Sequence, residues 1–399
     1  MCDGLYSDRN RRGRIDGLVI GKRRKRLKIA DVASFPVSYT LHRPFANSAE
    51  KHSSRSTTLV KITTDEGVTG WGEAYGPSLG ISRFIQTYLK PRLIGQDPLP
   101  LEYLWFKLQT HKGVPKGAMG GIDLALWDLK ARALNVPVYE LLGGRNTSVI
   151  TPYATGFFFN EDDPDATTYL EEEVAEVQSR KFRALKMKIG FGKDRDIKRM
   201  ERVRELVSDQ IDMMVDANQA YDFMTCMELV PCLTDLKVRW LEEPMPWQSF
   251  DGYKELRKKV SFAIAGGEAE TDYRGFIEAI REHVVDVIQP DLAASGGLTN
   301  SRRVAVLAEA FQVDFQPHVF GTILALPAAV QLMASVTNNQ PWMLFPRPVM
   351  LEWDTTPNPM ATDLLKNPLR LIDGLLQVPE GIGIGVEVNE EAIKNYLME

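Results

Sequence analysis

The stretch Val238-Arg239-Trp240-Leu241-Glu242 is a short β-rich segment that ends in a carboxylate. It decides the fold because similar segments recur at equal spacing along the chain. The same arrangement occurs twenty-six residues earlier, where Asp216 ends a similar segment, and twenty-six residues later at Glu268. One strand and one helix of a β/α barrel together span about 25–30 residues. The equal spacing therefore predicts that three successive strands of a parallel barrel each place one carboxylate at the mouth, where the C-terminal strand ends meet.

The pattern continues on both sides of this stretch. Short β-rich runs alternate with helical patterns such as Tyr169–Arg180, Lys198–Val207 and Ser301–Phe311, whose apolar residues recur at helical spacing. Eight such units predict an α/β protein with a parallel β/α barrel over residues 146–369. The predicted strands are Val149–Ala154, Ala184–Ile189, Asp212–Ala217, Arg239–Glu243, Ala263–Gly267, Val284–Pro290, Asp314–His318 and Met343–Trp353.

The residues before the barrel follow a different pattern, in which strands come first and helices follow. This order predicts an α+β domain over residues 28–145. The C-terminal segment 370–399 is expected to complete that domain, because Leu371–Val388 again looks like strands. The expected elements are the strands Lys28–Val37, Thr57–Thr63 and Val68–Glu73 and the helix Ala118–Leu134.

Composition limits the class of protein. Of 399 residues, 44% are hydrophobic and 25% are charged, which is typical of globular proteins. There is no run of about 18 apolar residues, so we expect no membrane partner. The three cysteines, Cys2, Cys226 and Cys232, do not form a disulfide framework, and we expect a cytoplasmic location.

Residues 1–27 form a basic extension. Residues 1–28 carry ten Lys or Arg against three Asp, although the whole chain has a net charge of −5. The run Lys22-Arg23-Arg24-Lys25-Arg26 is of a kind that binds nucleic acid or an anionic surface. We favour the alternative of an extension without ordered structure. The acidic remainder of the chain argues against nucleic acid as a partner.

The three strand-end carboxylates predict a metal site. Asp216, Glu242 and Glu268 offer only oxygen ligands, which suit a hard divalent cation, Mg²⁺ above all. Without a cation, their mutual repulsion would make burial costly. The alternative is that one or two of them pair with Arg or Lys.

Two lysines share one face of a predicted strand. Lys186 and Lys188 flank Met187, and alternate side chains of a strand point the same way. Buried ammonium groups need nearby anions, and neighbouring cations lower a lysine pKa until the amine is a usable base. Two surface lysines on an edge strand remain the alternative.

Three further residues lie at predicted strand ends. His318 and Asp291 end neighbouring strands, so the carboxylate is placed to fix the imidazole tautomer and raise its basicity. Glu352 falls at the end of the eighth strand. If protonated, it would donate a hydrogen bond to a substrate oxygen, and the alternative is an ordinary ion pair.

Taken in this order, these residues resemble the enolase superfamily, specifically its mandelate racemase subgroup. The resemblance covers nearly the whole chain from about Leu27 to Glu399. The matching segments are Lys186-Met187-Lys188, Val215-Asp216-Ala217-Asn218, Trp240-Leu241-Glu242-Glu243-Pro244, Gly267-Glu268, Gln289-Pro290-Asp291 and His318.

The resemblance implies a modified TIM (β/α) barrel with an N-terminal α+β capping domain. It also implies the roles of the site residues. These are Asp216, Glu242 and Glu268 as ligands of one Mg²⁺ per active site, Lys188 as one base with Lys186 beside it, the His318–Asp291 dyad as the opposite base, and Glu352 as the acid of the eighth strand.

The shared chemistry is loss of the proton α to a substrate carboxylate, with the metal stabilising the resulting enediolate. Loss of a β-hydroxyl, with His318 as general acid, makes the protein a lyase. Return of a proton on the other face makes it a racemase or epimerase of a hydroxy or amino acid. We favour a dehydratase of a sugar acid, aldonate or aldarate, that gives a 2-keto-3-deoxy acid. A non-catalytic binding scaffold is a third possibility, against which the intact set of residues counts.

The preference rests on Leu41–Arg55, which the resemblance makes a capping-domain loop over the substrate. This loop is polar and cationic, which suits hydroxyls and a second carboxylate. We expect His42 and Arg43 there, and Asn218 in the barrel, to bind substrate, unless the loop side chains face solvent. The expected partners are a small-molecule carboxylate and further copies of the chain in a homo-oligomer.

Overall fold

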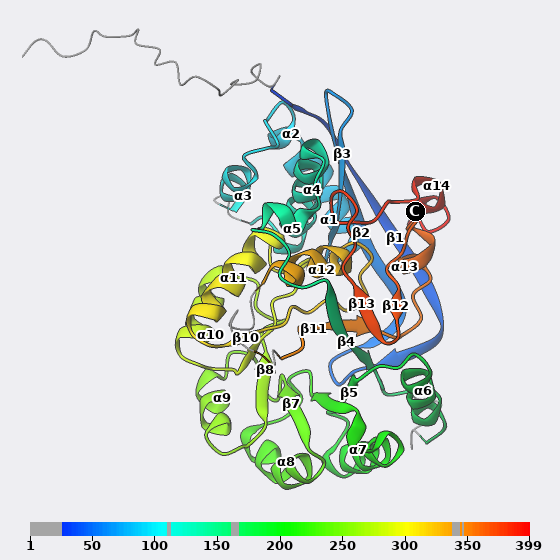
Figure 1. The fold of residues 1–399 in the computed structure, drawn as a ribbon, viewed down its shortest axis with the longest axis vertical. Coiled ribbons are helices and arrows are strands. Elements are labelled where there is room, and N and C mark those ends of the chain that lie inside the picture. Colours follow the sequence, from blue (N-terminus) through cyan, green and yellow to red (C-terminus); the bar gives the residue numbers. More distant parts are fainter. Residues whose placement is uncertain (1–25, 110–112, 161–166, 337–343, 345–346) are drawn as a thin grey trace, which may run out of the picture.

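The computed structural model describes residues 26–109, 113–160, 167–336, 344 and 347–399. Figure 1 shows two parts, a sheet with helices above and a ring of strands and helices below. The basic extension lies almost wholly outside the described residues. The domain limits at residues 27, 145 and 369 stay predictions.

The upper part is built on a three-stranded antiparallel sheet in the order β1-β2-β3. Helix α4 packs against β3 so closely that a side chain at Gly70 or Gly72 would collide with the α4 backbone. This helix ends at Leu134, and the left-handed conformation of the next residue, Asn135 (φ 60°), terminates it before Pro137. The elements are β1 Ile29–Ala46, β2 Lys51–Thr64, β3 Thr69–Ala74, α1 Ser78–Phe84, a π-helical turn Ile85–Leu89, α2 Lys90–Leu93, α3 Leu101–Gln109, α4 Lys116–Leu134 and α5 Val138–Leu141.

The predicted loop Leu41–Arg55 is mostly strand, so that prediction was wrong. Strands β1 and β2 continue as a ribbon in which Phe45 pairs with His52, and only residues 47–50 form the turn. A register shift after Thr40 interrupts the ladder, which is why alternation alone did not reveal the strand. Figure 1 shows this long ribbon reaching down from the upper sheet to the strands of the barrel.

The lower part is the predicted barrel. Strands β4 to β10 pair in chain order, each parallel to the next, and β11 pairs with β4 in parallel. Helices α6 to α11 lie outside these strands (Figure 1). The strands are β4 Val149–Gly156, β5 Ala184–Lys188, β6 Asp212–Asp216, β7 Val238–Glu242, β8 Ala263–Gly266, β9 Val287–Ile288, β10 Asp314–Phe315 and β11 Met350–Asp354. The helices are α6 Thr167–Ser179, α7 Lys193–Val207, a short 3-10 turn Ser208–Gln210, α8 Phe223–Asp235, α9 Phe250–Arg257, α10 Tyr273–Arg281, α11 Leu298–Ala310 and α12 Ala325–Ser335.

The last barrel strand and the C-terminal segment differ from expectation. Strand β11 begins at Met350 rather than Met343, which lies outside the described residues. The C-terminal hairpin pairs with β4 of the barrel, Leu376 opposite Ile150, and not with the first sheet. The residues after the hairpin contact the upper part: Gly383 pairs with Pro137 before α5, Glu387 accepts from Arg132 of α4, and α14 lies beside β1 and β2 (Figure 1). These elements are α13 Met360–Asp363, β12 Leu371–Ile372, β13 Leu375–Gln377 and α14 Glu390–Ile393.

Two buried carboxylates of the upper part hold the N-terminal ends of two barrel helices. Glu73 of β3 accepts hydrogen bonds from the backbone N–H of Ile323, Leu324 and Ala325 at the start of α12. Asp123 of α4 accepts from the backbone N–H and the hydroxyl of Thr299 at the start of α11. These helix ends leave N–H groups without partners inside the helix, so the carboxylates act as caps supplied by the other domain.

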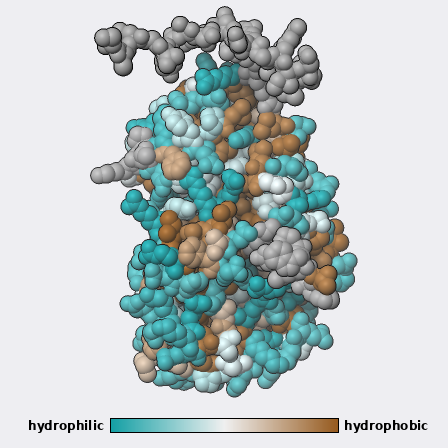
Figure 2. Space-filling view, turned by 60° about the vertical axis from the view of Figure 1, so that its left-hand side comes forward, coloured by the Kyte–Doolittle hydropathy of each residue, from teal (hydrophilic) through white to brown (hydrophobic). Residues whose placement is uncertain are grey.

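Over the described residues alone, the helices can be compared with the length and apolar character of a membrane span. None of the helices in the described ranges combines the length and the apolar character that a bilayer crossing requires. The face turned forward in Figure 2 is largely hydrophilic, with scattered hydrophobic side chains.

Candidate active site

The barrel interior has two layers that follow from strand alternation. On β5, β6 and β7 the inward positions carry an apolar or small residue first and a charged residue two positions later, as in Met214 and Asp216 or Trp240 and Glu242. The apolar layer is therefore a floor, and the charged side chains lie above it at the mouth. The floor consists of Tyr153, Ala184, Met214, Trp240, Ala265, Val287 and Met350.

Asp216, Glu242 and Glu268 meet above this floor, as predicted, and are called the acid triad below. One carboxylate oxygen from each lies within 4.8 Å of the others. Asp216 and Glu242 are fully buried, and Glu268 is partly exposed at the mouth. Burial raises the pKa of Glu242 to about 7, although Lys186 acts in the opposite direction. Three carboxylates this close repel each other unless positive charge lies between them.

The donor set fits Mg²⁺. Every atom that the acid triad offers is a carboxylate oxygen, which hard divalent cations prefer. Glu268 Oε2 is buried and accepts no hydrogen bond, although His318 Nε2 lies 3.2 Å away. Asn218 Oδ1 is also buried without a partner, and Asn218 Nδ2 donates to Glu268 Oε1 at 3.3 Å. Glu268 Oε2 and Asn218 Oδ1 are thus two oxygen atoms at the site without a hydrogen-bond partner, as a cation-binding site would need.

Both predicted lysines point into the site from β5. Lys186 Nζ contacts Glu242 and lies 2.9 Å from Glu352, and Lys188 Nζ contacts Asp216. Burial lowers the pKa of Lys188, but Asp216 outweighs this effect and holds the pKa above its usual value. Both lysines are buried, so the alternative of two surface lysines is wrong.

His318 and Asp291 form the predicted dyad. His318 Nδ1 lies 2.6 Å from Asp291 Oδ2, and the two residues pair as a parallel bridge beyond β9 and β10. Asp291 Oδ1 accepts from the backbone N–H of Ala294 at 2.7 Å, which fixes the carboxylate. Burial lowers the pKa of His318, but Glu268, Glu352 and Asp291 raise it to about 10. The surrounding carboxylates therefore favour the protonated imidazole.

Glu352 lies at the site as an ionised carboxylate. It pairs with Lys186 and accepts from the hydroxyl of Thr155 at 2.7 Å and from the backbone N–H of Val319 at 3.0 Å. Burial raises the pKa of Glu352, but Lys186 and His318 outweigh this effect and hold it below its usual value. These partners favour an acceptor, whereas the expected hydrogen-bond donor requires a proton.

The two loop residues proposed for substrate binding lie elsewhere. His42 is exposed and packs edge-on against Tyr39 of its own strand. Arg43 is exposed, donates to Glu172 of α6 at 3.3 Å and stacks on the ring of Tyr169. Their contacts are with β1 and α6 rather than with the acid triad, because the supposed loop is part of a two-stranded ribbon.

The ribbon instead brings His52 to the mouth, which the sequence reasoning missed. His52 lines a cavity of about 470 Å³ between the two parts of the molecule. Its ring contacts Phe45 on the neighbouring strand, with centroids 5.1 Å apart. The pairing of Phe45 with His52 follows from the register of the hairpin. A prediction of this ribbon from the sequence would therefore have placed His52 opposite Phe45. The cavity is lined by Glu50, Lys51, His52, Ser53, Ser54, Arg55, Ser56, Thr57, Glu73, Tyr75, Gly76, Pro77, Ala293, Phe320, Gly321 and Thr322.

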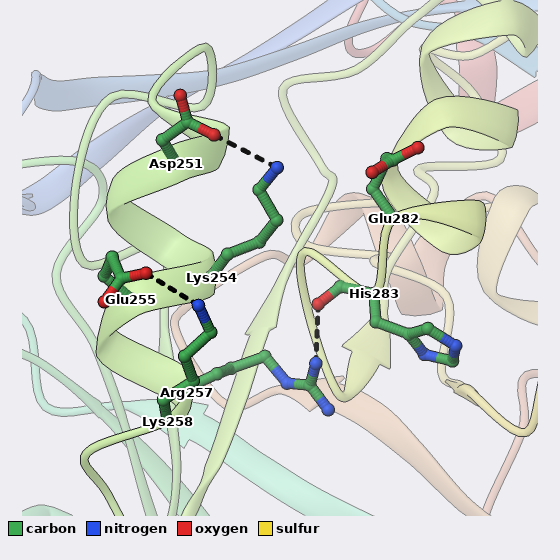
Figure 3. Close-up of a pocket in the computed structure, with 7 residues that line it drawn as sticks. All are labelled: Asp251, Lys254, Glu255, Arg257, Lys258, Glu282 and His283. Atoms are coloured by element: carbon green, nitrogen blue, oxygen red, sulfur yellow. Dashed lines mark hydrogen bonds and ion pairs between the residues drawn. The ribbon is translucent and has the colours of Figure 1, made fainter.

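A second pocket, of about 550 Å³, lies on the outer surface between α9 and α10. Figure 3 shows its charged side chains already paired, Asp251 with Lys254 and Glu255 with Lys258. Arg257 donates to the carbonyl oxygen of His283. These partners satisfy one another, and the pocket contains none of the residues predicted for catalysis.

The comparisons agree with this geometry. Residues 29–143 match the family model described as mandelate racemase / muconate lactonizing enzyme, N-terminal domain, and residues 169–392 match the model described as enolase C-terminal domain-like. The chain therefore belongs to the mandelate racemase and muconate lactonizing enzyme family of the enolase superfamily.

Individual relatives cover nearly the whole chain. The D-galactarolactone cycloisomerase of Agrobacterium fabrum is 34% identical over 378 residues, which are 93% of this chain and 99% of the relative. The D-gluconate dehydratase of Thermoproteus tenax is 32% identical over 361 residues, 86% of this chain and 70% of the relative. The crystal structure of the 3,6-anhydro-D-galactonate cycloisomerase of Zobellia galactanivorans, 34% identical, has a TM-score of 0.83 and covers 93% of this chain and 100% of its own.

Proposed function

We propose that the protein is a Mg²⁺-dependent lyase that removes a β-hydroxyl from a sugar acid and gives a 2-keto-3-deoxy acid. The observation that carries the proposal is an acid triad that lies between Lys188 and the His318–Asp291 dyad. The family membership and the dehydratase among the relatives support the same chemistry.

The metal would be held by Asp216, Glu242 and Glu268. When bound, Mg²⁺ supplies positive charge that offsets the triad and the charge that develops on the substrate carboxylate. A bound cation would weaken the hold of Asp216 on the proton of Lys188. Lys188 is placed at the site to accept the proton from the carbon next to the substrate carboxylate.

His318 acts on the leaving group in this proposal. The bond between the β-carbon and its hydroxyl breaks, and the proton of His318 Nε2 leaves with the hydroxyl as water. The enol that remains takes up a proton at the β-carbon and becomes the 2-keto-3-deoxy acid. Asp291 keeps the proton on the other ring nitrogen in place.

A second candidate is a cycloisomerase, favoured by two relatives of this class that match the chain over almost their whole length. The same α-proton is removed and the same β-carbon–oxygen bond breaks. The leaving oxygen belongs to a lactone or ether ring, however, so it stays attached to the product. The chain's own residues perform the same proton transfers in both reactions.

The test is a screen of aldonates, aldarates, their lactones and anhydro sugar acids with Mg²⁺ in D₂O. Dehydration gives a 2-keto-3-deoxy product that is lighter by one water, and cycloisomerisation gives a keto product of unchanged mass. Deuterium at the α-carbon without a keto product would identify a racemase or epimerase instead. Absence of both product and deuterium with every acid sugar would contradict the proposal.

A further inference from the structure

We propose that Arg199 of α7 is a positioning residue for Lys188, the proposed base. Its guanidinium joins the end of β5, which carries Lys188, to the chain that follows β4. A change at Arg199 should therefore slow removal of the α-proton without weakening the binding of substrate or Mg²⁺. This inference rests on the proposed function and adds a residue to its machinery.

Strands β4 and β5 stop pairing just before the base. Their last pair is Gly156 with Met187. The residue after Gly156 is Phe157, whose left-handed backbone (φ 58°) ends the extended conformation of the strand. The carbonyl groups beyond this pair need partners from outside the ladder of β4 and β5, because buried carbonyl groups are almost always hydrogen-bonded.

Arg199 supplies those partners. Its Nη1 donates to the carbonyl oxygen of Lys188 at 2.8 Å, and its Nη2 donates to those of Phe157 and Phe158 at 2.7 Å and 3.2 Å. The residue is only 2% exposed. A charged donor with a planar fork forms stronger and more directional hydrogen bonds than a neutral donor. One guanidinium thus fixes the ends of two neighbouring strands relative to each other.

The same contacts determine what surrounds the amine of the base. The ring of Phe158 lies 5.4 Å from Lys188 Nζ, which also contacts Asp216 on the next strand. Arg199 therefore holds the backbone of the base and the backbone of the aromatic residue beside it. A displacement of a reacting group by about 1 Å can lower a rate by about 10².

Two carboxylates hold the N–H groups of the same segments. Glu173 of α6 accepts from the backbone N–H of Phe157 at 2.9 Å. Asp196, one turn before Arg199 on α7, accepts from the backbone N–H of Gly190, just beyond the base, at 3.0 Å. Burial lowers the pKa of the Arg199 guanidinium, and the negative charges of Asp196 and Glu173 act against that effect. The buried cation therefore has counter-charges beside it.

The first test is Arg199→Lys, which keeps a positive charge beside Asp196 and Glu173. An ammonium group lacks the planar fork that reaches all three carbonyl oxygens. With a substrate found in the screen, kcat should fall by about 10- to 100-fold while KM stays within about threefold. The rise in melting temperature with Mg²⁺ should match that of the wild type, because the acid triad is unchanged.

The second test identifies the step that is slowed. A substrate with deuterium at the α-carbon reports how far removal of the α-proton limits the rate. The isotope effect on kcat should be at least as large in Arg199→Lys as in the wild type. A smaller isotope effect with a lower kcat would show that another step is slowed, and would overturn the positioning role.

The matched control is the same substitution elsewhere on α7. The side chain of Arg202 is 41% exposed and pairs with Glu171 and Glu205. Arg202→Lys should leave kcat, KM and the isotope effect unchanged. Thermal unfolding checks the fold of each variant. Arg199→Gln, whose planar amide offers two N–H donors, is the second variant if lysine is not tolerated, and the same kinetic changes are expected.

The outcomes separate this inference from the proposed function. A folded Arg199 variant with the kcat of the wild type would overturn the positioning role while the proposed function stands. A wild-type protein that turns over none of the acid sugars would overturn the proposed function, and with it the role of Lys188.

Discussion

His318 Nδ1 lies 2.6 Å from Asp291 Oδ2, and the two residues pair across neighbouring strands that end at the barrel mouth. The carboxylate is itself fixed by the backbone N–H of Ala294. The other ring nitrogen, Nε2, then points toward Glu268 at 3.2 Å. One nitrogen of the ring is held for orientation and the other is left for chemistry, as the proposed acid requires.

Asp291→Asn should lower kcat by a factor of about 10²–10⁴, because an amide does not stabilise the charged imidazole or fix its tautomer. KM should change little, since Asp291 acts through His318. Steady-state kinetics on the substrate found in the screen will measure this. A kcat within threefold of the wild type would show that the dyad is structural.

Substitutions of the two proposed proton-transfer residues, Lys188 and His318, should have different effects on α-proton exchange and on elimination. Lys188→Met should abolish both α-proton exchange and product formation, because it removes the proposed base. His318→Asn should retain exchange in D₂O and lose elimination by a factor of about 10² or more, because it removes the acid. Lys181→Met, which replaces an exposed lysine outside the site, is the control. Full elimination activity in either site variant would exclude its assigned role.

Removal of the metal should lower stability. A cation bound at about a hundred times its dissociation constant stabilises the folded state by about 2.7 kcal/mol. The melting temperature should therefore rise with Mg²⁺ and fall with a chelator. The melting temperature of the Asp216→Asn variant should change little with Mg²⁺. That of Asp212→Asn, which alters the exposed start of the same strand, should rise with Mg²⁺ as in the wild type. An equal Mg²⁺ response in both variants would refute the triad as the site.

Asp123 should make stability depend on pH. Burial raises the pKa of Asp123 to about 7, against a value of about 3.9 in an unfolded chain. The folded state therefore binds the proton of Asp123 more tightly than the unfolded state does. The contribution of protonated Asp123 to the free energy of unfolding is fully present below about pH 4 and is lost as the pH rises to about 7. The difference between the folded and unfolded pKa of Asp123 corresponds to about 4 kcal/mol in the free energy of unfolding.

Asp123→Asn mimics the protonated form and should flatten this dependence. Chemical unfolding of both proteins between pH 4 and pH 8 measures it. The free energy of unfolding of the wild type should fall relative to the variant as the pH rises. Parallel curves would show that Asp123 does not titrate in this range.

The barrel could be predicted because its strands are short apolar runs at regular spacing. Strands β5 and β6 end within one residue of the predicted Ile189 and Ala217. The ribbon of β1 and β2 could not be predicted, because its register shift breaks the alternation of polar and apolar residues. The pairing of Leu376 with Ile150 is a long-range contact that no local pattern reveals.

The features of the site also fall into those that the sequence predicts and those that only the folded chain reveals. The structure brings together the acid triad, Lys188 and the His318–Asp291 dyad, because strand ends converge at the barrel mouth. The ionisation of Glu352 depends on Lys186, Thr155 and Val319, which only the folded chain places around it. His52 reaches the cavity through the twist and register of a ribbon, which its polar neighbours in the sequence do not indicate.

The most direct measurement is proton NMR of a C6 aldonate in D₂O with the wild-type protein, with and without Mg²⁺. We predict that the signal of the α-proton disappears and a 2-keto-3-deoxy product forms only when Mg²⁺ is present, and that Lys188→Met shows neither change. Persistence of the α-proton in the presence of Mg²⁺ for every acid sugar, or equal loss of the signal in a chelator, would contradict the proposed chemistry.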